Sequence, residues 1–133
     1  EATGEPDVTL VLQGSGVTLA FVQDTLPRLL DDGIDAEVVY VASPELFDRL
    51  PEAERRATYD APRADRAMGI TGFTLPTMYR WIRSDVGRRH TMHPFMNGHY
   101  LGSGAGDMVI HEAGLDGEGQ HRRVREYLDA TAR

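Results

Sequence analysis

The apolar and polar positions of the first forty residues follow two different periods. Residues 8–12 form a mainly apolar run and residues 35–41 form a second one, as expected for buried strands. Between them, residues 17–32 repeat their apolar positions at helical spacing, and Gly33 is placed to end this helix. Two buried strands joined by such a helix lie parallel in one sheet. The pattern therefore predicts an α/β fold.

The rest of the chain alternates short apolar segments with polar ones. Pro27 is expected to kink or split the first helix, and Ser43 followed by Pro44 is typical of a helix start. The remaining elements that we expect are helices at 44–50, 51–59, 75–82, 104–113 and 117–132, strands at 67–73 and 90–93, and loops or connections at 60–66, 83–89 and 96–106.

Composition limits the function more than the fold. The chain has 133 residues and a net charge of −7, which predicts one domain and argues against broad binding to nucleic acid or an anionic membrane. It has no cysteine and no lysine, so disulfides, thiol nucleophiles and Schiff-base chemistry are excluded. No apolar run approaches the roughly 18 residues of a membrane span, and no signal-peptide pattern is visible. We therefore expect a cytoplasmic protein.

The chain is expected to be organised as a short linker and one domain. Residues 1–7 are polar and carry Gly4 and Pro6, which is typical of a linker, and residues 8–133 form the domain. Because the sequence starts at Glu1, we expect a processed or excised piece of a larger protein.

The turn after the first strand is the first candidate site. Gly14, Ser15 and Gly16 present backbone N–H groups at the start of a helix, where anions bind. A dinucleotide fingerprint needs a further glycine at position 19, where Leu19 stands. The turn is therefore interpreted either as a purely structural one or as a small-anion site.

The histidines are the second candidate. His90, His93, His99 and His111 are close in sequence, and the spacing of the first two could serve a metal. We favour ordinary loop and cap roles, and keep the alternatives of a metal hydrolase and of one histidine that reaches a neighbouring active site. A serine hydrolase at Ser103 is rejected because Leu101 stands where the motif needs glycine.

Three segments, in this order, carry a resemblance to a known family. They are residues 10–17 (Leu-Val-Leu-Gln-Gly-Ser-Gly-Val), residues 38–48 (Val-Val-Tyr-Val-Ala-Ser-Pro-Glu-Leu-Phe-Asp), and residues 102–106 (Gly-Ser-Gly-Ala-Gly) leading to residues 112–116 (Glu-Ala-Gly-Leu-Asp). Their order resembles the C-terminal domain of transketolase and of the homodimeric first component of pyruvate dehydrogenase, both thiamine-diphosphate enzymes. Gly16 departs from the family, which has an acidic residue after Gly-Ser.

The resemblance implies a three-layer α/β/α domain with a mostly parallel sheet of about five strands. It also implies a C-terminal domain or split small subunit with a structural, dimerisation or docking role in two-carbon ketol or acyl transfer. Thiamine diphosphate and a divalent metal are then expected in the partner domains and not in this chain. The expected partners are those domains, a second copy, or an acyl carrier.

No catalytic residue and no metal ligand is transferred to this chain. Residues 115–119 only superficially resemble the family's diphosphate-binding motif. The aromatic and histidine residues of the second half are the candidates for an interface or for approach to a neighbouring active site: Trp81, His93, Phe95, His99 and Tyr100. The alternative function is a free-standing α/β module that binds a small anion at Gly14 to Gly16.

Overall fold

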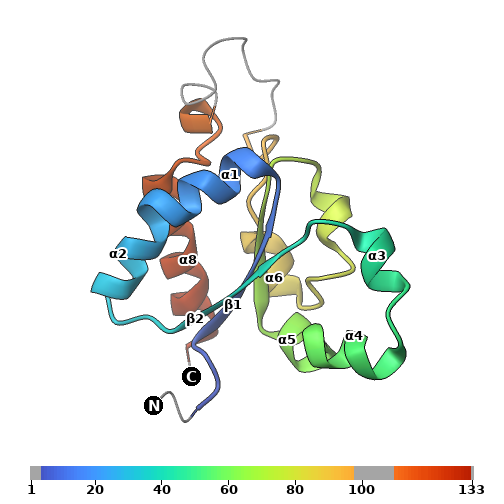
Figure 1. Cartoon of the computed structure of the whole chain (residues 1–133). Helices are drawn as coiled ribbons and strands as arrows, with labels where there is room; N and C mark the ends of the chain where they lie inside the picture. The colour runs from blue at the N-terminus through green and yellow to red at the C-terminus, as the bar shows by residue number, and fades with distance from the viewer. Residues whose placement is uncertain (1–3, 98–109, 133) are drawn as a thin grey trace.

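The computed structural model describes residues 4–97 and 110–132 (Figure 1). Its centre is a parallel sheet of three strands in the order β2-β1-β3. The strands are β1 (Val8–Gln13), β2 (Ala36–Tyr40) and β3 (Ala67–Thr71). In register, Leu10 lies between Val38 of β2 and Met68 of β3. The expected α/β class and the parallel pairing of the first two strands are confirmed.

The expected number of strands is wrong for the described residues, which hold three strands and not about five. Residues 90–93 were expected to form a strand, but only Met92 makes an isolated parallel bridge, to Ile70. The reason is that α6 (Asp85–His90) already includes His90, and Pro94 follows closely. Too few residues remain for a strand.

The first helix divides into three parts, as Pro27 predicted. They are α1 (Ser15–Ala20), the π-helical turn η1 (Phe21–Thr25) and α2 (Leu26–Asp31). Proline has no N–H group to donate to the carbonyl four residues earlier, and the hydrogen-bond pattern widens just before it. Gly33 follows in the left-handed region, with φ 74°, and ends the helix.

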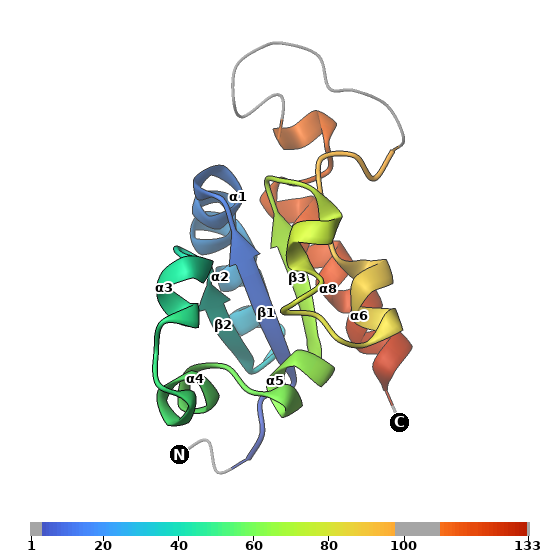
Figure 2. The same cartoon turned by 90° about the vertical axis from the view of Figure 1, so that its right-hand side faces the viewer.

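Helices cover both faces of the sheet (Figures 1 and 2). The first face carries α1, η1, α2 and α8 (Gly117–Thr131), and α6 lies beside β3 and α8. The second face carries α3 (Pro44–Asp48), α4 (Glu52–Thr58), α5 (Ala61–Asp65) and the 3-10 turn η2 (Leu75–Met78). The domain therefore has the expected three layers.

Two segments that were expected to be loops are helical. Asp60 caps α5 by accepting a hydrogen bond from the Arg63 N–H, and Ser84 caps α6 by accepting one from Gly87. Their charged side chains suggested loops, but each helix buries one small residue, Ala64 or Gly87. The helix expected at 75–82 is the shorter η2, and the one expected at 104–113 is described only at 110–112, before Gly114 with φ 73°.

Side chains alternate across β1 and enter two separate cores. Leu10 and Leu12 face the first core, and Val11 faces the second. The main members of the first core are Val17, Phe21, Leu29, Met68, Ile70, Val124 and Tyr127. The main members of the second core are Tyr59, Ala64, Ala67, Met78, Trp81 and Ile82. None of the described helices is both long and apolar enough to cross a bilayer.

Candidate functional site

The turn at the carboxyl end of β1 is held by backbone contacts with the loop after β3. Gly14 has φ 106°, and a Cβ placed on it would lie 3.3 Å from the Gly72 nitrogen. The Gly72 N–H donates to the Gln13 carbonyl over 2.9 Å. The Gln13 side-chain oxygen accepts hydrogen bonds from the Thr71 and Thr77 hydroxyls, each over 2.9 Å. Glycine is therefore required at position 14 by its conformation and by this close approach.

A pocket of about 550 Å³ opens above this turn. Helix geometry leaves the N–H groups of Ser15 and Gly16 without intrahelical acceptors, and both residues line the pocket. The remaining wall is largely apolar and includes Phe73, Phe95 and Ile110, and none of the described lining residues is charged. The described part of the pocket therefore offers no side-chain cation to accompany the N–H groups, and the small-anion site stays a prediction.

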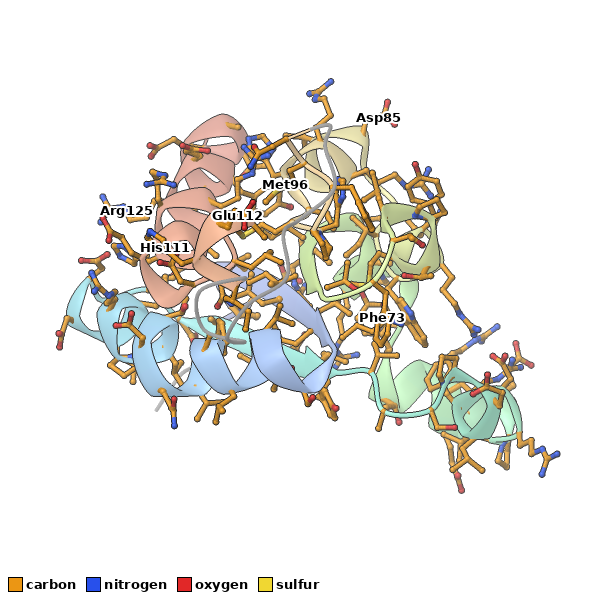
Figure 3. All side chains as sticks on the ribbon, turned by 90° about the horizontal axis from the view of Figure 1, so that it is seen from above. Phe73, Asp85, Met96, His111, Glu112 and Arg125 are labelled. Carbon is orange, nitrogen blue, oxygen red and sulfur yellow. The ribbon has the colours of Figure 1, made fainter. Side chains whose placement is uncertain are left out.

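Figure 3 looks down on this end of the domain, with Phe73 on one side and His111 and Glu112 on the other. The described histidines here have separate partners. His93 Nδ1 accepts from the Phe95 N–H over 3.2 Å, and burial, followed by the nearby charge of Arg123, lowers the pKa of His93. His111 Nδ1 lies 2.6 Å from an Asp116 oxygen, and this hydrogen bond raises the pKa of His111.

His90 makes a further separate contact, between its Nδ1 and the Val86 carbonyl, over 2.7 Å. Within residues 4–97 and 110–132, no three His, Asp or Glu side chains come together in a way that could hold a metal. His99 lies outside the described residues. His90, His93 and His111 therefore each make a separate local hydrogen bond.

The candidate interface residues Trp81 and Phe95, which the structure describes, do not lie on one surface. Trp81 is only 4% exposed and lies in the second core, where its ring meets Phe47 and Tyr59 edge-on at 5.2 and 5.6 Å. Phe95 is 43% exposed and lines the pocket at the carboxyl end of the sheet. Trp81 therefore offers almost no surface to a partner. Two further candidates, His99 and Tyr100, lie outside the described residues.

The segment that superficially resembles a diphosphate motif has a structural role. Asp116 caps α8 by accepting a hydrogen bond from the Gly119 N–H over 3.0 Å. A Cβ on Gly117 would lie 2.2 Å from an Asp24 oxygen, and one on Gly119 would lie 2.1 Å from the Gly114 carbonyl oxygen. These close approaches explain why glycine stands at both positions. That the isolated chain does not bind thiamine diphosphate stays a prediction.

A second cavity, of about 320 Å³, lies on the opposite face of the sheet. It is lined by Arg55, Arg56, Arg80, Arg83 and Trp81, among others. Sequence reasoning missed it because the stretch 51–65 reads as a solvated charged face, and the arginines come from segments far apart in the chain.

No protein-family model matches this sequence, and no curated protein matches it. Solved structures do match. A transketolase from Leishmania mexicana superposes with a TM-score of 0.69 at 19% identity, over 98% of this chain and 18% of the enzyme. One from Campylobacter jejuni gives 0.67 at 17% identity, over 95% and 18%, and one from Pichia stipitis gives 0.66 at 20%, over 96% and 17%. The chain has a transketolase-like fold.

This transketolase-like chain spans less than a fifth of the length of each of these enzymes. That proportion is consistent with a single domain such as the C-terminal one. The expected resemblance is thereby confirmed at the level of the fold.

Proposed function

We propose that this chain is the C-terminal domain or a split small subunit of a thiamine-diphosphate-dependent, transketolase-like enzyme, and that its role is assembly. The observation that carries the proposal is the fold match, which takes in nearly all of this chain and less than a fifth of a transketolase. A domain of this size has to pack against the remainder of such an enzyme. The surface of the described residues supports this role.

A stripe of exposed apolar side chains runs along the first helix. Leu19, Val22 and Leu30 are 58%, 55% and 64% exposed. On the same helix, Thr25 and Asp32 bond to α8, so the stripe lies on the side away from α8. Exposed apolar side chains that lie together are typical of a surface that another chain or domain covers.

The edge strand β2 continues this apolar surface. Val38 and Tyr40 are 41% and 51% exposed, and they pair in register with Leu10 and Leu12. They therefore share the sheet face that carries the first helix. β2 has a strand neighbour on one side only among the described residues. We call the side chains of Leu19, Val22, Leu30, Val38 and Tyr40 the apolar margin, and propose that the other domains of the enzyme cover it.

This proposal gives the chain no catalytic group. Thiamine diphosphate, when bound by the other domains, would supply the chemistry that moves a two-carbon ketol or acyl unit. The contribution of this chain is to hold those domains together through the apolar margin. A second copy of the chain or an acyl carrier is a further proposed partner.

The test is reconstitution of the assembly. The tagged chain, expressed in the organism that makes it, should copurify with a polypeptide that binds thiamine diphosphate. The purified assembly should transfer a two-carbon ketol unit only when thiamine diphosphate is present. Val22→Asp with Leu30→Asp should abolish copurification, because two carboxylates cannot be buried without partners.

Tyr79→Asp is the control, since Tyr79 is also exposed, at 41%, but follows η2 on the other face of the sheet. It should leave the assembly intact. Purified chain that recovers only itself, or that recovers the partner equally well with both variants, would contradict the proposal. The isolated chain should not bind thiamine diphosphate in a fluorescence titration.

A further inference from the structure

The outer edge of β2 carries backbone groups that have no strand partner. The Val41 N–H donates to the Leu12 carbonyl over 2.8 Å, so position 41 directs its backbone groups toward β1. Because these groups alternate along a strand, positions 37 and 39 also bond to β1, and the outward N–H and C=O groups are those of Ala36, Val38 and Tyr40. Among the described residues, no strand pairs with that side of β2.

This edge has little of the protection that exposed strand edges usually have. Natural edges are commonly shielded by lysine, proline, an unpaired charge or a bulge. The strand β2 reads Ala-Glu-Val-Val-Tyr and pairs with β1 in unbroken register. Its one charged side chain, Glu37, is already held, because the Arg63 Nε–H lies 3.1 Å from each of its carboxylate oxygens. The edge is therefore open to a further strand.

Apolar side chains lie on both sides of this edge. Val38 and Tyr40 are exposed on the first face of the sheet. On the second face, the exposed Leu46 of α3 shares with Tyr40 a largely apolar hollow of about 250 Å³. A strand added to β2 would present side chains to both faces of the sheet, and would therefore cover apolar surface on each of them.

The sequence of β2 fits a second copy of itself. Strands related by a two-fold axis pair antiparallel, and outward positions then lie opposite outward positions. A pairing centred on Val38 uses all three outward positions, since Val38 faces its own copy and the large Tyr40 faces the small Ala36. Glu37 then lies opposite Val39, so no like charges meet. A centre at Glu37 would oppose two carboxylates, and a centre at Val39 would leave Ala36 without a partner in the strand.

We infer that two copies of this chain pair through the outer edges of β2, antiparallel and centred on Val38, and so form one continuous sheet. The inference deepens the proposed assembly role and rests on it, because it names the second copy as the occupant of the β2 end of the apolar margin. The helical part of the margin, Leu19, Val22 and Leu30, remains for the other domains. The two proposals fail separately, since pairing is measured on the chain alone and assembly by copurification.

The first test is the mass of the purified full chain in sedimentation equilibrium. Between about 1 μM and 1 mM, the mass should rise from that of one copy to that of two, with Kd below about 100 μM. In the same samples, amide exchange followed by NMR should slow with concentration at Val38 and Tyr40. It should stay unchanged at Glu37 and Val39, whose N–H groups already donate to β1. A chain that remains a single copy over this range, or the same response at all four amides, would overturn the inference.

Charge substitutions at Val38 test the register. Val38→Asp and Val38→Lys each place like charges opposite one another across the two-fold axis, and each should weaken pairing about tenfold or more. An equal mixture of the two variants should pair again, because opposite charges then face each other. Tyr79→Asp is the matched control, since Tyr79 is also 41% exposed but lies under the guanidinium of Arg88 in α6, on the β3 side of the sheet. It should leave the Kd of pairing unchanged.

Circular dichroism should show the same fold for all three variants, because both substituted positions are exposed. A mixture that pairs no better than either Val38 variant alone would overturn the inference, and so would equal weakening by Tyr79→Asp. If Val38→Asp leaves the mass of the isolated chain unchanged but releases the polypeptide that binds thiamine diphosphate, the edge meets another domain. The second copy would then be excluded as its occupant.

Discussion

Leu10 and Val11 are neighbours on β1, yet their side chains enter cores of different kinds. The core around Leu10 is mainly aliphatic and is covered by a helical segment from Ser15 to Asp31 and by the fifteen residues of α8. The core around Val11 is centred on Trp81 and is covered by helices of only five to seven residues. Helices this short depend on tertiary packing and on their caps.

The two faces also differ in how their polar groups are satisfied. Gln120 is fully buried on the first face, where its amide donates to the Val17 and Leu115 carbonyls and its oxygen accepts from the Thr25 hydroxyl. On the second face, the buried N–H groups of Trp81 and Arg55 have no partner among the described residues. The buried polar side chain of Gln120 on the first face is therefore satisfied within the chain, whereas two buried N–H groups on the second face have no partner among the described residues.

The largest loss of stability should come from a substitution in the first core. Phe21→Ala removes a fully buried ring and should lower the free energy of unfolding by about 3–5 kcal/mol. Val22→Ala is the control, since Val22 is adjacent but 55% exposed, and should change it by no more than about 0.5 kcal/mol. Urea denaturation measures both. Similar losses for the two variants would show that the first face is not the closed core described here.

A smaller loss of stability should distinguish the buried polar groups of the first face from those of the second. Gln120→Met should cost about 1–3 kcal/mol, because the buried Leu115 carbonyl loses its amide donor. Arg55→Met should stay within about 0.5 kcal/mol of the unchanged chain, because its buried Nε has no hydrogen-bond partner among the described residues. Equal losses of unfolding free energy, measured by urea denaturation, would mean that the buried polar groups of both faces are hydrogen-bonded alike. That result would contradict the difference described between the two faces.

The short helices of the second face should depend on their caps. Ser43→Ala removes the hydroxyl that accepts from the Leu46 N–H, and should cost about 1 kcal/mol. Ser15→Ala should change little, because the α1 start has no side-chain cap. Amide exchange should show the loss first in residues 44–50. A uniform loss of protection over the whole chain would contradict separate packing of the two faces.

The smallest expected effect is a pH-dependent contribution to stability from the His111–Asp116 pair at the start of α8, on the first face. The hydrogen bond to Asp116 raises the pKa of His111. The pair therefore contributes its full stabilisation below about pH 6.5, the ordinary pKa of histidine. This stabilisation is lost as the pH rises through the raised pKa of the folded state. Asp116→Asn keeps a good capping residue but removes the charge. An NMR titration should then give His111 a lower pKa. An unchanged His111 pKa would show that the pair does not form in solution.

Several elements follow from short-range chemistry and were predicted correctly. The apolar run at 8–12, the split of the first helix at Pro27 and the Ser43 cap each depend on residues a few positions apart. The helices at 61–65 and 85–90 were missed because their charged faces hide the single small residue that each of them buries. A fourth strand was expected at 90–93 from the pattern and a fifth from the family resemblance, and the described residues contain neither.

The sequence by itself determined the parallel α/β arrangement, because strand and helix periods and glycine or proline stops are local properties of the chain. Only the tertiary structure decided that Arg55, Arg80 and Trp81 share one cavity while Trp81 and Phe95 lie apart. It also decided which apolar residues of the first helix stay exposed. These outcomes depend on how distant segments pack across the sheet, which no local pattern encodes.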